Sequence, residues 1–175
     1  MATRRSTIKG AGAFLGSGVR RSDGTQRRFG ATSVRRSNYS FNAVPSTLIA
    51  PCGMNCRLCQ RYIRDKEACP GCRGDDDLKA KSCVRCRIRN CVKMVQTRCK
   101  YCFGCDSFPC ARLKNLDKRY RTKYGMSMID NLGDIRKFGI RRFIRNEKER
   151  WTCPECGQAI CVHRPQCPFC LQKWR

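Results

Sequence analysis

The motif Cys153-Pro154-Glu155-Cys156 is followed, ten residues later, by the similar motif Cys167-Pro168-Phe169-Cys170. Each motif places two residues between its cysteines, and a tight turn with that spacing directs two thiolates at one metal ion. A short hairpin between the motifs brings four thiolates into a tetrahedron, so this stretch predicts a zinc ribbon. Cys161 and His163 lie between the motifs. We interpret both as residues that do not bind the metal, with either one as an alternative ligand.

A larger group of cysteines precedes this stretch, because twelve of the seventeen lie between Cys52 and Cys110. The pairs Cys56/Cys59 and Cys69/Cys72 are nine residues apart and predict a compact four-thiolate site. The pair Cys83/Cys86 is expected to share a metal with two of the later cysteines, which are Cys91, Cys99, Cys102, Cys105 and Cys110. Cys52 completes the group, and the spacing does not fix the pairing within it.

We expect these thiols to bind zinc, about four ions in all, rather than to form disulfides. Seventeen is an odd number, the sequence shows no apolar signal segment, and adjacent half-cystines at this spacing form strained rings. An iron–sulfur cluster is the alternative, because the run from Cys99 to Cys110 differs from a ferredoxin motif by one residue in its last gap. The loop Cys52-x3-Cys56-x2-Cys59 copies that of radical enzymes, but the chain lacks the alternating strands and helices of their barrel.

The charge of the chain points to a polyanionic partner. Its formal net charge is +25, and four zinc ions held by four thiolates each lower this to about +17. The charge is spread along the chain rather than gathered on one amphipathic face, which favours nucleic acid over a membrane. No apolar run approaches the roughly twenty residues that cross a bilayer. The candidate contacts to nucleic acid are Arg27, Arg28, Arg35, Arg36, Arg119, Arg121, Arg141 and Arg142.

The composition divides the chain into four segments and predicts a small, metal-stabilised α+β fold with a loop-rich cysteine cluster, short helices and a C-terminal zinc ribbon. Helices are expected over residues 107–124, from Ser127 to about Gly139, and over residues 140–150. The four segments are a basic extended arm at 1–45, a multi-cysteine metal-binding module at 46–110, a basic helical segment at 111–150 and the zinc ribbon at 151–175. The arm is also read as a mitochondrial targeting peptide or a plain linker.

Several stretches carry a resemblance to a known family. They are Pro51-Cys52-Gly53-Met54-Asn55-Cys56-Arg57-Leu58-Cys59, Cys69-Pro70-Gly71-Cys72-Arg73-Gly74, Phe108-Pro109-Cys110-Ala111-Arg112-Leu113-Lys114, Lys118-Arg119-Tyr120-Arg121-Thr122-Lys123-Tyr124-Gly125-Met126-Ser127-Met128 and Trp151-Thr152-Cys153-Pro154-Glu155-Cys156-Gly157. From Ala50 to Arg175 the chain resembles a family of small, cysteine-rich bacterial and archaeal proteins of unknown function. The resemblance implies a metal-binding domain and supplies no established activity. The basic arm lies outside the family pattern.

Together these features predict a non-enzymatic zinc protein that binds structured RNA, most simply ribosomal RNA beside neighbouring subunits of a ribonucleoprotein, in the cytoplasm or the mitochondrial matrix. Two alternatives stay open. One is an iron–sulfur redox or assembly factor, and the other is a zinc-scaffolded adaptor within an organellar complex. Hydrolytic catalysis on a small-molecule substrate is disfavoured, because all-thiolate zinc sites are closed and no Ser/His/Asp or phosphate-cradling motif is present.

Overall fold

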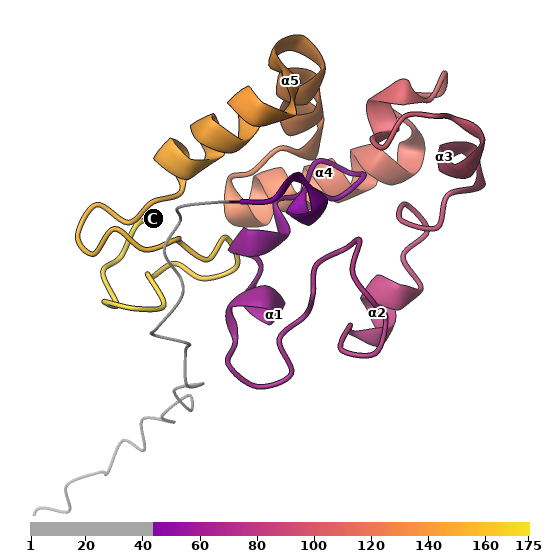
Figure 1. The fold of residues 1–175 in the computed structure, drawn as a ribbon. Coiled ribbons are helices and arrows are strands. Elements are labelled where there is room, and N and C mark those ends of the chain that lie inside the picture. The colour runs from indigo at the N-terminus through magenta and orange to yellow at the C-terminus, as the bar shows by residue number, and fades with distance from the viewer. Residues whose placement is uncertain (1–43) are drawn as a thin grey trace, which may run out of the picture. The chain divides into compact units, whose positions relative to one another are not determined.

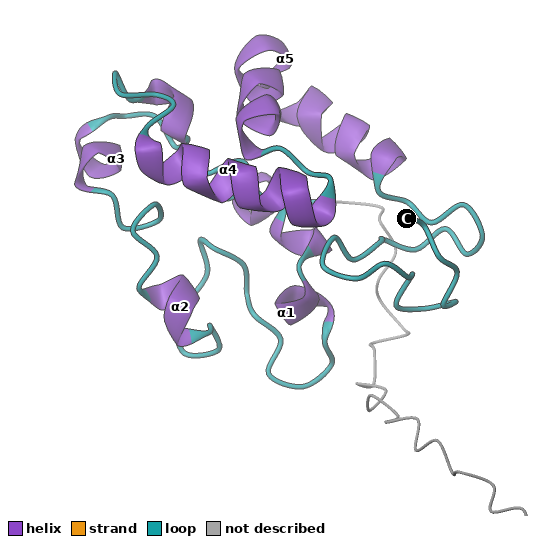
Figure 2. Ribbon diagram, turned by 180° about the vertical axis from the view of Figure 1, so that it is seen from behind, coloured by secondary structure: helices purple, strands orange, loops and turns teal. Residues whose placement is uncertain are grey.

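The computed structural model describes residues 44–175, which form a helix-rich unit (Figure 1). Figure 2 shows two long helices, α4 and α5, and a series of short helices joined by long loops. In chain order the elements are η1 Ser46–Leu48, η2 Cys56–Leu58, α1 Gln60–Ile63, α2 Lys81–Val84, α3 Val92–Gln96, η3 Cys102–Gly104, α4 Ala111–Tyr124 and α5 Met128–Arg150. No helix among these is long and apolar enough to cross a membrane.

The expected α+β class is not confirmed. Within residues 44–175 the extended pairing is limited to three isolated antiparallel bridges, Ile49–Asn55, Thr152–Ala159 and Gln166–Lys173. The physical reason is the density of turns, because the tight turns at Cys153/Cys156 and Cys167/Cys170 each leave room for one bridging pair and no longer strand. The protein is therefore a small helix-rich fold in which the cysteine segments are turns and loops.

Helix α4 begins later than the sequence pattern predicts and ends where predicted. Cys110, with extended backbone (φ −71°, ψ 163°), precedes the first helical residue. The expected start at 107 is wrong because Phe108 precedes Pro109, and a residue before proline is disfavoured in helical conformation. Gly125 ends the helix in the left-handed conformation (φ 62°), and its N–H donates to the Arg121 carbonyl at 3.2 Å.

Helix α5 begins and bends where the sequence predicts. The Ser127 hydroxyl accepts a hydrogen bond from the Asp130 N–H at 3.0 Å and so caps the first turn. Gly139 has non-helical backbone angles (φ 78°, ψ 161°), which divide the element into the two helical stretches expected on either side of it. Leu132 before the bend and Phe143 after it are both buried.

The loop that carries the first cysteines is seated directly on α5. Gly53 has φ +86°, and a Cβ atom there would lie 2.8 Å from the Met128 carbonyl oxygen and 2.9 Å from the Leu132 side chain. The Asn131 side chain donates to the Gly53 carbonyl at 3.0 Å. One hydrophobic core, which includes Leu58 and Leu132, therefore holds the cysteine loops against the long helices.

Asp117 joins the two long helices, and its replacement by asparagine is expected to destabilise the fold by about 1–3 kcal/mol. The buried carboxylate accepts hydrogen bonds from the Arg121 side chain (2.7 Å), the Ser127 hydroxyl (2.8 Å) and the Ile129 N–H (3.0 Å). In asparagine an NH2 group replaces one carboxylate oxygen, so at least one of these three donors would face a second donor instead of an acceptor. Urea unfolding of Asp117→Asn and of Asp134→Asn, an exposed position on α5, measures the difference. Equal midpoints for the two variants would contradict the role of Asp117.

The same carboxylate gives the stability of the fold a pH dependence. Burial opposes ionisation, but the hydrogen bonds from Ile129, Arg121 and Ser127 hold the pKa of Asp117 below its usual value. An acid whose folded pKa is lowered stabilises the protein above its unfolded pKa of about 3.9, and this contribution is lost as the pH falls through the folded pKa. We therefore expect the difference in unfolding free energy between wild type and Asp117→Asn to shrink below about pH 4.

Candidate metal centres

The four cysteines of the C-terminal motifs, Cys153, Cys156, Cys167 and Cys170, form one tight cluster in which every pair of sulfur atoms is within 4.8 Å. The Cys153 and Cys170 sulfurs are 3.6 Å apart, as are those of Cys156 and Cys167. A zinc ion with four Zn–S bonds of about 2.3 Å requires sulfur separations of about 3.8 Å. The cluster therefore has the dimensions of a tetrahedral metal site. All seventeen cysteines of the chain are free thiols.

The cluster is built from the same turn made twice. The Cys153 N–H donates to the carbonyl five residues later at 2.8 Å, and the Gly157 N–H donates back to the Cys153 carbonyl at 2.9 Å. Cys167 and Leu171 repeat the two bonds at 2.8 and 3.1 Å. Gly157 and Leu171 both adopt left-handed backbone, with φ 68° and 63°. The repetition explains why the two similar motifs present their thiols as matching halves of one site.

Backbone N–H groups favour ionised sulfur in this cluster. Burial opposes ionisation of Cys153, but N–H donors from Cys156 and Glu155 lower the pKa of its thiol to about 7. Burial is the main cause that raises the pKa of the Cys156 thiol to about 12. A set of four thiols at this spacing, two of them buried, is stable in charged form when a cation replaces the protons, so the chemistry of the donor set fits a metal ion.

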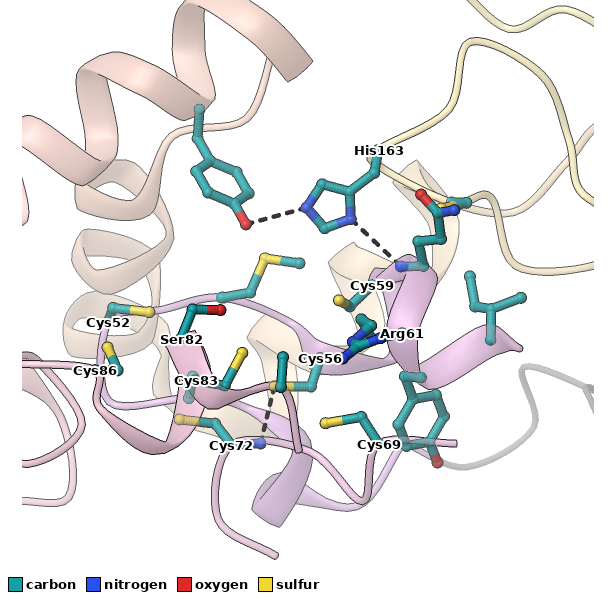
Figure 3. Close-up of a pocket in the computed structure, with 18 of the residues that line it drawn as sticks. Cys52, Cys56, Cys59, Arg61, Cys69, Cys72, Ser82, Cys83, Cys86 and His163 are labelled. Carbon is teal, nitrogen blue, oxygen red and sulfur yellow. Dashed lines mark hydrogen bonds between the residues drawn. The ribbon is translucent and has the colours of Figure 1, made fainter. Parts of the chain in front are cut away.

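A cavity of about 790 Å³ gathers the first seven cysteines of the chain (Figure 3). These residues come from the loop before η2, from η2 and the residue after it, from the segment between α1 and α2, and from α2 and the turn that follows it. They are Cys52, Cys56, Cys59, Cys69, Cys72, Cys83 and Cys86. The Cys72 N–H donates to the Cys56 sulfur at 3.3 Å. The cavity therefore unites the predicted four-thiolate set with Cys52 and with the Cys83/Cys86 pair.

The C-terminal segment closes one wall of this cavity. The Val162 N–H donates to the Leu58 carbonyl at 2.9 Å, which places Cys161 and His163 on the cavity lining. The Gln60 N–H donates to Nδ1 of His163 at 3.3 Å, and Nε2 lies 3.1 Å from the Tyr120 hydroxyl. Because Nδ1 accepts, the neutral ring carries its proton on Nε2 and donates it to Tyr120. Burial lowers the pKa of His163, which keeps the ring neutral.

A second cavity, of about 590 Å³, is lined by the later cysteines Cys91, Cys102, Cys105 and Cys110. Burial, and then the nearby thiols of Cys110 and Cys91, raise the pKa of the Cys102 thiol to about 12. Cys99 is packed against Gly104, at one end of η3. The cysteines between Cys52 and Cys110 are therefore divided between the two cavities: those up to Cys86 line the first cavity, and four of the five from Cys91 onward line the second. Within residues 44–175, the cysteines whose sulfur atoms all lie within 4.8 Å of one another are Cys153, Cys156, Cys167 and Cys170.

The candidate arginines on the long helices are all exposed. Arg121 forms ion pairs with Asp117 (2.7 Å) and Asp130 (2.8 Å). The guanidinium of Arg119 lies 5.9 Å from the ring centre of Tyr120, and that of Arg142 lies 4.8 Å from the ring centre of Phe138. Arg141 is the fourth member of this group. The other four candidates, Arg27, Arg28, Arg35 and Arg36, lie outside the described residues.

Two cations that line the large cavity, Lys79 and Arg89, form an ion-pair network that was not predicted from the sequence. From sequence, the run Asp75-Asp76-Asp77 is interpreted as a solvated turn, yet Asp76 pairs with Lys79 at 2.9 Å and with Arg89 at 2.8 Å. The Lys79 side chain is fully buried and also donates to the Cys72 carbonyl at 3.1 Å. The sequence indicates the Asp76–Lys79 pair only through its spacing, because the lysine follows the acid by three residues.

Comparison with known proteins places part of the chain in a recognised sequence class. Residues 48–115 match the profile of a family described as "Protein of unknown function (DUF3795)". No curated protein and no solved structure matches the chain. The matched segment contains every cysteine of the two cavities except Cys161. The predicted resemblance to cysteine-rich proteins of unknown function is confirmed.

Proposed function

Starting from a cysteine-rich protein with a segment of the DUF3795 type, we propose a non-enzymatic, zinc-stabilised scaffold that binds structured RNA. The C-terminal motifs serve as a zinc ribbon, the two cavities as further metal sites, and the basic surface of α4 and α5 as the RNA contact. The arginines of residues 1–45 extend that contact. Such a protein suits a ribonucleoprotein such as a ribosome, in the cytoplasm or the mitochondrial matrix, where ribosomal RNA and neighbouring subunits surround it.

The metal part of the proposal rests on the C-terminal cluster. Four thiolates fill a tetrahedral coordination sphere and leave no position for a reactive water, so the site suits structural zinc rather than catalysis. Thiolate ligands also favour soft metals such as zinc over magnesium or calcium. The bound metal ties together a segment that has little regular structure of its own, and this is the role of zinc in small ribbon folds.

The observation that carries the RNA proposal is the imbalance of exposed charge on the long helices. All thirteen Lys and Arg side chains of α4 and α5 are exposed. Of the five acidic side chains on the same helices, Asp117 and Glu147 are buried and bonded within the fold. Folding therefore hides negative charge and presents positive charge, and a surface of this kind attracts the phosphate backbone.

The bend of α5 adds a feature suited to nucleic-acid bases. Phe138, beside the bend at Gly139, is 38% exposed. The ammonium of Lys137 lies 5.0 Å from the centre of its ring and the guanidinium of Arg142 lies 4.8 Å from it. The exposed ring and the two cations beside it offer an unpaired base an apolar contact next to two groups that bind phosphate.

RNA binding is expected to weaken steeply with salt, and the variant Arg141→Gln/Arg142→Gln is expected to lower the slope of log affinity against log salt by about two. Fluorescence anisotropy with a labelled RNA hairpin between about 50 and 200 mM salt measures the slope. The matched control is Lys66→Gln/Lys81→Gln, which removes the same charge from exposed positions outside the two helices. Affinity that is flat over this range, or equal slopes for the two variants, would contradict the proposed contact.

A further inference from the structure

We propose that the large cavity holds a metal centre of two ions rather than one, and that Cys161 of the C-terminal segment is one of its ligands. This inference rests on the proposed metal sites of the cavities, and its tests do not depend on whether the protein binds RNA. It extends the sequence prediction in two ways. It joins Cys52, Cys83 and Cys86 to the predicted four-thiolate set, and it gives a role to a cysteine that the motif spacing left unused.

The first argument is the number of thiols that share the space. Eight cysteines line one cavity, and one tetrahedral ion uses four of them. Figure 3 shows Cys52 and Cys86 toward one end of the group and Cys59 and Cys69 toward the other. Cys59 lies close enough to Cys69 and Cys83 for their charges to interact, and Cys72 likewise neighbours Cys86. The eight thiols are therefore spread along the cavity, and their number is sufficient for two tetrahedral ions.

The second argument is an internal comparison with the C-terminal cluster. There the sulfur of Cys153 accepts N–H bonds from the residues two and three positions later, and the sulfur of Cys167 does the same. In the large cavity the sulfurs of Cys59 and Cys161 each accept N–H bonds from the residues two and three positions later. The same pattern of N–H groups around the sulfur is thus present at two further thiols, and these two lie close enough for their charges to interact.

The third argument is the charge of the cavity lining, which contains no acidic residue. Its six basic residues are Arg61, Arg64, Lys79, Arg89, Arg119 and Arg164. Asp76, which pairs with Lys79 and Arg89, lies outside the lining. Arg64 likewise pairs with Glu67, at 3.4 Å, so three of the six cations have an acidic partner outside the lining. Neutral thiols would leave the lining itself with positive charge and no negative charge. Two divalent ions with eight thiolates carry a net charge of −4, which the basic lining stabilises.

Alkylation of the intact chain separates a two-ion centre from a one-ion centre, because Cys83 is exposed. The zinc-loaded chain is treated briefly with iodoacetamide, and each cysteine is located by peptide mass analysis. A metal-bound thiolate is protected, so we expect Cys83 and Cys86 to react about tenfold more slowly than Cys99, which lies outside both cavity linings. Treatment with EDTA is expected to abolish the difference. Reaction of Cys83 and Cys86 at the rate of Cys99, with Cys56 protected, would overturn the two-ion centre.

The role of Cys161 needs a second measurement, because this side chain is 1% exposed and burial alone slows its alkylation. Native mass spectrometry of the full chain, with zinc as the metal, counts the ions retained during titration with a chelator. Cys161→Ser is expected to release one zinc ion at a chelator concentration about tenfold lower than wild type does, and Cys99→Ser is expected to match wild type. Identical release from wild type and Cys161→Ser would remove Cys161 from the ligand set.

Discussion

Removal of the proposed zinc ion with EDTA under reducing conditions is expected to unfold residues 151–175. The four thiols of the C-terminal cluster lie 3.6 Å apart in pairs and are joined by turns rather than by strands. A structural zinc site contributes on the order of 10 kcal/mol, comparable with the whole unfolding free energy of a small domain, about 5–15 kcal/mol. Without the metal, little in this segment replaces that contribution.

Tryptophan fluorescence reports this transition directly. Both tryptophans of the chain lie in the segment, and the rings of Trp151 and Trp174 meet edge to face with centres 5.4 Å apart. Cys156→Ser is expected to shift the emission toward that of the EDTA-treated protein, and the same substitution at Cys99, outside the cluster, is expected to leave it unchanged. An emission spectrum that EDTA does not alter would contradict the structural role of the metal.

Phe143→Ala is expected to destabilise the protein by about 3–5 kcal/mol. Phe143 is 2% exposed and belongs to the core that seats the cysteine loops on α5, so its removal leaves a cavity and deletes many contacts. Phe138→Ala is the matched control, since the same side chain, five residues earlier and 38% exposed, has little core contact to lose. We expect its cost to be about 0.5 kcal/mol or less.

Chemical denaturation of zinc-loaded wild type and the two variants measures both costs. Equal destabilisation by the two substitutions would contradict the assignment of Phe143 to the core. Phe138→Ala has a further expected effect, because the exposed ring is part of the proposed RNA contact. It should weaken hairpin binding while the unfolding midpoint stays close to that of wild type.

The elements that local rules govern were predictable from sequence. Gly125 and Gly139 supply backbone angles that other residues rarely adopt, and Ser127 caps a helix start with its own side chain. The C-terminal thiol cluster was predictable for the same reason, because two short turns place each pair of ligands. The start of α4 was misplaced, although the residues before Pro109 carry the local signal that moves it.

The features that depend on distant parts of the chain were not predictable. The cysteines between Cys52 and Cys110 are divided between two cavities that different parts of α4 line, Ala111 to Leu113 in one and Leu116 to Tyr124 in the other. No spacing between cysteines encodes that packing. Cys161 reaches the large cavity through a backbone bond from Val162 to Leu58, more than a hundred residues away in sequence. From sequence, Glu147 is likewise expected to be an exposed charge. It is instead buried, and its carboxylate accepts hydrogen bonds from the side chains of Asn55 and Trp151. Burial raises its pKa.

The most direct test of a metal-stabilised protein is the native mass of the full chain, purified under anaerobic conditions with its metal analysed in parallel. We predict about four zinc ions, one in the C-terminal cluster, two in the large cavity and one in the cavity of Cys91, Cys102, Cys105 and Cys110. A metal-free mass, lower by two hydrogens for each cysteine pair, would show disulfides and contradict the account. Iron with inorganic sulfide in place of zinc would contradict the assignment of the metal.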